Sequence, residues 1–118
     1  MMKLSYESRA LSEDLIYVEL KGEFGYPDVL HTKDELYRLL GKAKKNLLID
    51  LNSLEYIDSV GIGVIIGLQK RASELEGTLS LICRKGKIFK IIELVGLDKA
   101  FNLFSSFAAA RQSLLGVS

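Results

Sequence analysis

The sequence predicts a single α/β domain in which a mixed sheet of four to five strands is combined with about four helices. Three observations lead to this fold class. The chain of 118 residues has room for one domain of ordinary size, residues 1–118. Short apolar runs with strand patterning alternate along it with segments of helical periodicity. One alternation, residues 47–83, has about the 37 residues of a strand-helix-strand unit, which requires parallel strands.

The N-terminal part predicts a hairpin at one side of the sheet. Leu4 and Tyr6 form the first alternating stretch, and residues 15–20 form the second, across the polar break of residues 8–14. A turn-rich loop, residues 22–27, follows and contains the only proline.

Two helices and two strands are predicted next. Thr32 precedes Glu35 by the spacing of a capping box, so the first helix is expected to start there. Residues 47–51 are almost continuously apolar, which is typical of a central strand covered on both faces. Seven connecting residues separate this strand from the second helix, which Gly77 can terminate before a strand at residues 78–83. The apolar face of the first helix is expected to consist of Leu36, Leu39, Leu40 and Ala43.

The C-terminal part predicts a third amphipathic helix, residues 88–95, which ends at Gly96. Residues 101–103 are expected to add a short strand. Ser105 or Ser106 then caps a final helix that continues to Leu115.

Composition and charge exclude several functions. With 48% hydrophobic and 26% charged residues, the chain has the composition of a soluble globular protein. Sixteen basic and fifteen acidic residues give a net charge of +1, which argues against nucleic acid or an acidic membrane as a partner. Cys83 has no second cysteine to pair with. We therefore expect a cytoplasmic protein without a membrane span, metal or cofactor, monomeric when free.

The candidate site lies between the central strand and the second helix, at residues 52–63. Asp58 and Ser59 stand at the start of this helix, where Ser59 is either the N-cap or the first helical residue, and free backbone N–H groups there favour an anion. Gly61 and Gly63 each cost a helix about 1 kcal/mol relative to Ala, which close approach by another molecule would explain. Simple capping, and close packing of Gly63 and Gly67, are the alternatives.

The chain resembles the STAS family in three segments, and more narrowly the bacterial anti-sigma factor antagonists. The segments are Leu47 to Asp50, Tyr56-Ile57-Asp58-Ser59-Val60-Gly61-Ile62-Gly63-Val64, and Ile91-Ile92-Glu93-Leu94-Val95-Gly96-Leu97-Asp98-Lys99-Ala100-Phe101.

The resemblance implies a protein that captures an anti-sigma factor while a serine is unphosphorylated, and so frees a sigma factor. By position in the motif that serine is Ser59. The implied partners are an anti-sigma factor that is itself the serine kinase, with a histidine-kinase-like ATPase fold, and a PP2C-type phosphatase. The implied partner-binding residues are Asp58, Ser59, Val60, Gly61, Ile62 and Gly63.

The chain departs from the family pattern after the second strand. Relatives commonly carry Leu-Asp after Gly-Glu, whereas this chain reads Gly22-Glu23-Phe24-Gly25. The acidic side chain near the phosphorylation loop is therefore absent at Gly25, and Asp28 is a candidate substitute.

Other functions are compatible with parts of the sequence. Within the resemblance, related domains also serve as subunits of stress-sensing complexes. Dinucleotide binding through Gly61, Gly63 and Gly67 conflicts with their spacing, with the seven preceding residues and with Arg84 at the end of the next strand. A serine hydrolase needs a base, and the only histidine is His31, expected in a loop.

Two further patterns leave alternatives open. A basic cluster at the start of the third helix either holds a phosphate or acidic partner or is a solvated face; it consists of Arg84, Lys85, Lys87 and Lys90. A second apolar stripe on the second helix, formed by Val64, Leu68 and Leu75, is either part of a docking face or buried under the neighbouring helix.

Overall fold

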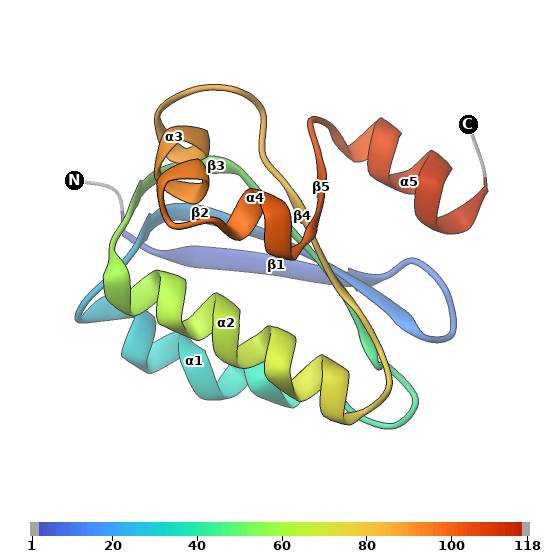
Figure 1. Cartoon of the computed structure of the whole chain (residues 1–118). Coiled ribbons are helices and arrows are strands. Elements are labelled where there is room, and N and C mark those ends of the chain that lie inside the picture. Colours follow the sequence, from blue (N-terminus) through green and yellow to red (C-terminus); the bar gives the residue numbers. More distant parts are fainter. Residues whose placement is uncertain (1–2, 117–118) are drawn as a thin grey trace.

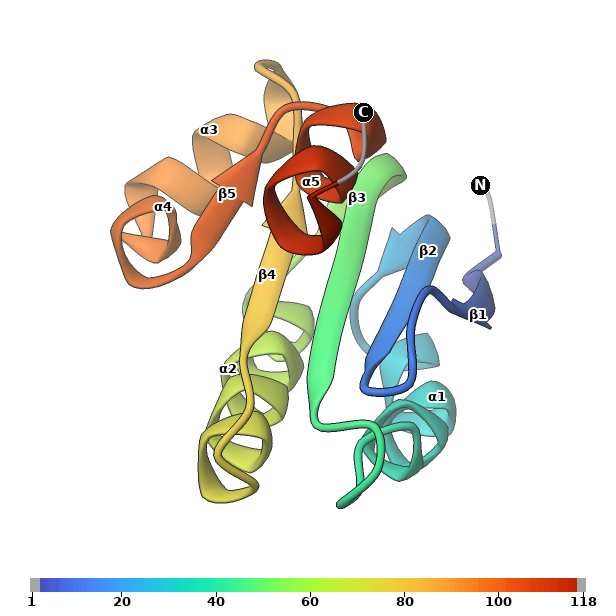
Figure 2. The same cartoon turned by 90° about the vertical axis from the view of Figure 1, so that its right-hand side faces the viewer.

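A five-stranded mixed sheet with helices on both faces forms the protein (Figures 1 and 2). The computed structural model describes residues 3–116. The strands lie side by side in chain order; β1 is antiparallel to β2, and the other neighbours are parallel. The elements are β1 Ser5–Ala10, β2 Leu15–Phe24, α1 Asp28–Arg38, β3 Asn46–Ile57, α2 Ser59–Glu74, β4 Leu79–Ile82, α3 Lys87–Leu94, α4 Leu97–Ala100, β5 Asn102–Phe104 and α5 Phe107–Leu115. The predicted fold class is confirmed.

The main core lies between the sheet and helices α1 to α4. Alternate residues of the central strands point into it, among them Val18, Ile49 and Leu81, all at most 1% exposed. Helix α5 covers the opposite face, where Ala110 packs on a small second cluster with Leu48 (Figure 2). Burial on both faces explains why β3 begins as a continuous apolar run.

The strands β1, β2 and β3 are longer than the sequence patterns predict. Strand β1 continues through Ala10, because an exposed edge strand can be polar. Strand β2 continues to Phe24, and Gly22, with φ of 92°, lies within it at a shift of register rather than in a turn. Strand β3 reaches Ile57, so the expected connection of seven residues is reduced to Asp58.

Helix α1 begins four residues before the predicted capping box, at Asp28, so Thr32 lies inside the helix. The hydroxyl of Tyr6 donates a hydrogen bond of 3.1 Å to the Glu35 carboxylate, which therefore does not cap the helix. The helix ends at Arg38, before Ala43, and the guanidinium of Arg71 satisfies the carbonyl oxygens of Tyr37 and Leu40 at this end.

The C-terminal elements follow the prediction closely. Strand β5 is displaced by one residue from the predicted range, and the hydroxyl of Ser106 caps α5 by accepting from the Ala109 N–H at 3.1 Å. A fifth helix, the four-residue α4, was not predicted. It begins after Gly96, whose φ of 79° ends α3.

Gly77 offers a test of how closely α2 packs against the loop before β3. The residue with positive φ at the end of α2 is Glu76, and Gly77 is needed because a Cβ there would overlap the carbonyl oxygen of Lys45. We expect Gly77→Ala to lower the free energy of unfolding by about 1–3 kcal/mol, as overpacking does. Gly41→Ala is the control, since a Cβ at Gly41 meets nothing within 4 Å. Urea denaturation measures both, and equal stabilities would contradict this packing.

Candidate functional site

The candidate site forms where β3 runs into α2 through a single residue, Asp58. This residue has extended backbone angles and is the N-cap of α2. Its Oδ1 accepts hydrogen bonds from the N–H groups of Val60 and Gly61, at 3.0 and 3.1 Å. Ser59 is thus the first helical residue, and it is exposed. The choice that the sequence left open is resolved in favour of Asp58 as the cap.

The other carboxylate oxygen of Asp58 ties the site to two further elements. Its Oδ2 accepts from the N–H of Tyr26, before α1, at 3.0 Å, and from the Tyr56 hydroxyl at 3.4 Å. Burial raises the pKa of Asp58, but these hydrogen bonds, with those from Val60 and Gly61, outweigh it and hold the pKa below its usual range. Asp58 is therefore a fixed carboxylate next to Ser59.

This arrangement corrects the expectation that the start of α2 is free to receive an anion. Two N–H groups of its first turn already bind the Asp58 carboxylate, and the N–H of Ile62 donates to the Asp58 carbonyl oxygen. A phosphate on Ser59 would lie beside a carboxylate. It would therefore add to an existing negative charge instead of neutralising the end of the helix.

Gly25 packs against this same carboxylate. A Cβ at Gly25 would lie 2.6 Å from Oδ2 of Asp58 and 2.7 Å from Cε2 of Tyr56. The departure from the family pattern thus has a local reason: the backbone at Gly25 is close enough for Tyr26 to bind Asp58, and Tyr56 occupies the adjoining space. Asp28, the candidate substitute for the missing acidic side chain, is the half-buried first residue of α1.

The glycines of α2 differ in their surroundings. A Cβ at Gly61 would overlap the carbonyl oxygen of Phe24, so close approach of the protein's own strand explains this glycine. Gly67 packs in the same way against the Tyr37 hydroxyl of α1. Gly63 is exposed and has nothing within 4 Å of a Cβ, so packing does not explain it.

The residues predicted to bind a partner divide into surface and interior. Ser59 and Gly63 are exposed, and Asp58 and Val60 are half-buried. Gly61 and Ile62 are buried, because that side of the first turn packs on the core.

Three further exposed side chains lie around this site, and of these only Tyr56 falls within the predicted segment 52–63. Ile66, 50% exposed, follows Ser59 and Gly63 at helical spacing on the outer side of α2. Tyr26 and Tyr56, 67% and 42% exposed, contact Asp58. We call these five residues, Tyr26, Tyr56, Ser59, Gly63 and Ile66, the Ser59 surface. The spacing of Ile66 was visible in the sequence, whereas only the fold brings Tyr26 to Asp58.

The structure also decides several of the open alternatives. Val64 and Leu68 are buried in the main core and Leu75 packs against it, so this stripe is not a docking face. His31 lies in α1 rather than in a loop. The predicted connection of seven residues between β3 and α2 was wrong, since only Asp58 connects them, and it no longer counts against dinucleotide binding. The glycine spacing and Arg84 still oppose that function.

Among residues 3–116, no three metal-ligating side chains come together, and no helix is both long and apolar enough to cross a bilayer.

Comparison with known proteins gives matches over most of the chain. The family model described as STAS domain matches residues 9–110. An anti-sigma-B factor antagonist of Listeria monocytogenes is 29% identical over 97 residues, which cover 82% of this chain and 85% of that protein. An anti-sigma factor antagonist from Mycobacterium paratuberculosis has a similar structure, with a TM-score of 0.79, 20% identity and coverage of 94% and 95% of the two chains. The Bacillus cell fate determinant SpoIIAA in its phosphorylated form has a TM-score of 0.71, 15% identity and coverage of 92% and 99%.

Replacing Asp58 by Asn distinguishes the contribution of the oxygen that caps α2 from that of the oxygen that binds the Tyr26 N–H. Asn keeps an acceptor for Val60 and Gly61 but presents an NH2 group to the Tyr26 N–H. We expect a loss of about 1–2 kcal/mol in the free energy of unfolding at pH 7.

The effect of this substitution should depend on pH. Because the pKa of Asp58 is lowered on folding, the carboxylate stabilises the fold above the unfolded pKa of about 3.9, and this contribution disappears as the pH falls through the folded value. Urea denaturation at several pH values should show the difference between the two proteins shrinking below about pH 4; a constant difference would contradict it.

The two glycines of the first turn should respond in opposite ways to alanine. Gly61→Ala is expected to cost about 1–3 kcal/mol, because its Cβ meets the backbone of Phe24. Gly63→Ala is expected to stabilise the helix by up to about 1 kcal/mol, since the site is open and Ala is the better helix former. Thermal and urea unfolding measure both, and a destabilising Gly63→Ala would mean that Gly63 has a structural role after all.

Proposed function

The chain belongs to the STAS domain family, and we propose that it is an anti-sigma factor antagonist, which binds an anti-sigma factor through the Ser59 surface and releases it when Ser59 is phosphorylated. The protein acts in this proposal as a binding module and not as an enzyme. An anti-sigma factor that is bound to this protein no longer holds its sigma factor, and the freed sigma factor then allows transcription. Because sigma factors act on transcription inside the cell, the protein is placed in the cytoplasm.

The position of Ser59 is the observation that carries the proposal. It is the exposed first residue of α2, in the Asp-Ser-x-Gly-x-Gly motif, and it lies among exposed aromatic and aliphatic side chains. Tyrosine is enriched in protein interfaces, and an exposed glycine such as Gly63 allows a partner backbone to come close. The names of the relatives, which include anti-sigma-B and anti-sigma F factor antagonists, agree with such a partner.

The energy of the switch comes from the local site and not from total charge. A phosphate adds about −1.5 to −2 charges and changes the net charge from +1 to about −1, which is a small global effect. A 100-fold loss of affinity needs about 2.7 kcal/mol, whereas a helix end contributes only about 0.3–1 kcal/mol. Steric exclusion, and burial of a dianion without a counter-charge, supply the larger penalty.

Asp58 strengthens this penalty. Its carboxylate already occupies the N–H groups that would otherwise bind a neighbouring phosphate, and the carboxylate is ionised near neutral pH. A phosphate on Ser59 therefore projects toward the partner. Its addition is assigned to the anti-sigma factor acting as a serine kinase with a histidine-kinase-like ATPase fold, and its removal to a PP2C-type phosphatase.

A negative charge at Ser59 is expected to prevent partner binding without unfolding the protein. Ser59→Asp should lower the affinity for the anti-sigma factor of the same organism at least about 100-fold in a calorimetric titration, because the charge is buried at the interface. Ser73→Asp is the matched control, since Ser73 is exposed on α2 away from the Ser59 surface. Equal affinities of Ser59→Asp and the unmodified protein would refute the proposed switch.

The kinase assignment has a separate test. Incubation with ATP and the anti-sigma factor, followed by mass mapping, is expected to place one phosphate on Ser59 and none on Ser59→Ala. Phosphate on another residue, or none, would refute the assignment of Ser59.

A further inference from the structure

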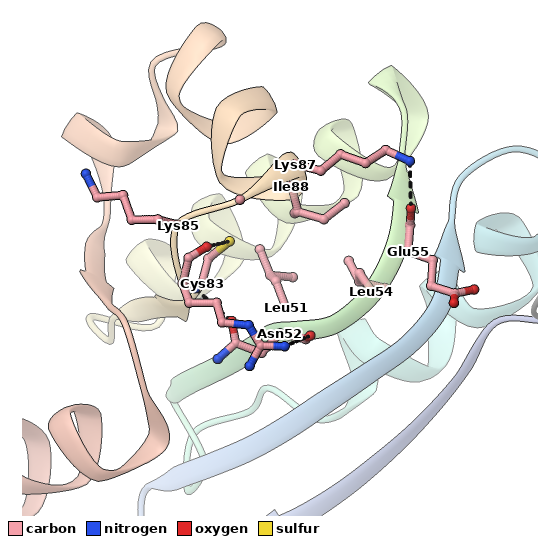
Figure 3. Close-up of a pocket in the computed structure, with 10 residues that line it drawn as sticks. Leu51, Asn52, Leu54, Glu55, Cys83, Lys85, Lys87 and Ile88 are labelled. Carbon is pink, nitrogen blue, oxygen red and sulfur yellow. Dashed lines mark hydrogen bonds between the residues drawn. The ribbon is translucent and has the colours of Figure 1, made fainter.

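A second concave site lies at the carboxyl ends of β3 and β4, and none of the residues of the Ser59 surface lines it. It is a pocket of about 190 Å³ between the C-terminal half of β3 and the start of α3 (Figure 3). In open α/β sheets, ligands bind in this position, beyond the carboxyl ends of parallel strands. Neither the family motif nor the proposed function uses it.

The pocket combines an apolar floor with a basic rim. Its floor is formed by the buried side chains of Leu51, Leu54 and Ile88, which face one another across it (Figure 3). The exposed cations Arg84 and Lys87 line the rim. Such a combination suits an anionic group attached to a small apolar body.

The rim cations have no acidic partner. Within residues 3–116, the ion pairs are those that Lys21 makes with Glu7 and Glu19, on the other side of the sheet. Glu55 lines the pocket, but its carboxylate turns away from it in Figure 3. The positive charge at the rim is therefore not neutralised by the protein.

The contacts that hold these two cations are long. Arg84 donates to the carbonyl oxygen of Asn52 at 3.5 Å, and the Lys87 ammonium donates to that of Glu55 at 3.4 Å. Charge-assisted hydrogen bonds to phosphate are shorter, at about 2.7–2.9 Å, and about twice as strong. Both side chains therefore gain by exchanging a main-chain oxygen for an anion. Lys85 takes no part, because it points away and lies 4.7 Å from the centre of the Phe89 ring (Figure 3).

The start of α3 completes the site. Gly86 precedes the helix and provides no side-chain cap, so the first N–H groups of α3 have no side-chain acceptor from that position. A Cβ at Gly86 would meet nothing within 4 Å, and its φ of 154° is unfavourable for other residues. The backbone at Gly86 is therefore open to a ligand, with Arg84 two residues before it and Lys87 one residue after it in the chain.

From these features we propose that the pocket binds a small phosphate-bearing ligand, with its phosphate at the start of α3 between Arg84 and Lys87 and its apolar part on Leu51, Leu54 and Ile88. The volume is below the roughly 300 Å³ of pockets for drug-sized ligands, so the apolar part is no larger than about one ring. This inference is independent of partner binding at the Ser59 surface.

Phenyl phosphate is a suitable probe, because it has one phosphate and one ring. In a titration of the full chain followed by nitrogen-15 NMR, in a buffer free of phosphate, we expect saturable shifts of the amides of Gly86, Lys87 and Ile88. The double variant Arg84→Gln/Lys87→Gln should raise the dissociation constant at least about tenfold, as loss of charged hydrogen bonds predicts. Lys42→Gln/Lys70→Gln removes the same charge from exposed positions outside the pocket and should leave the constant unchanged.

Each other outcome would overturn the proposal. A phosphate site would be excluded if the two double variants bound phenyl phosphate with equal affinity, or if the shifts spread over the surface lysines without saturation. It would also be excluded if phenol bound as tightly as phenyl phosphate. Saturable binding of an acidic peptide but not of phenyl phosphate would assign the pocket to a protein partner instead. None of these outcomes depends on the anti-sigma factor, so they leave the proposed function to its own test.

Discussion

The hydrogen bonds of one carboxylate, Asp58, hold together the part of the fold on which the candidate site depends. With its two oxygens it joins the start of α2, the loop before α1 and the end of β3. Each of these contacts satisfies a group that would otherwise be open to solvent or to another anion. Because the ionised carboxylate accepts these hydrogen bonds more strongly than the protonated acid would, they also explain why the pKa of Asp58 is lowered despite its partial burial.

This carboxylate determines what its neighbours can be. Gly25 has no room for a side chain, because Asp58 and Tyr56 occupy that space, and Gly61 must be a glycine because α2 begins against Phe24. Ser59 is then exposed, and the N–H groups of the three residues after it are already bonded to Asp58. Ser59 is therefore an exposed residue whose own side chain takes no part in the cap of α2, as the proposed switch requires.

The sequence predicted the fold well where one physical signal dominates. The buried run at Leu47 to Leu51 and the helical spacing after Ser59 were sufficient to identify β3 and α2. The boundaries were less accurate, because β3 continues as a strand through polar residues that pair only with β2. Thr32 and Glu35 match a capping box in isolation, yet main-chain contacts around Pro27 begin α1 earlier. At the site, the sequence gives Asp58 and Ser59 but not their contact with Tyr26, which depends on long-range packing.

Helices α2 and α3 begin beyond the carboxyl ends of β3 and β4, and they differ in which acceptors are available to their first N–H groups. At α2 a carboxylate of the chain itself binds these groups, whereas at α3 Gly86 offers none and two cations stand at the rim. The electrostatic potential at the start of α2 therefore disfavours a phosphate and that at the start of α3 favours one, although the two helix dipoles have the same sign. Under the two proposals, a phosphate attached to Ser59 would remain exposed beside Asp58, while a free phosphate-bearing ligand would be drawn to the start of α3. A nearly neutral chain can in this way separate a site that repels phosphate from one that attracts it, because within about a Debye length the placement of single charges matters more than their sum.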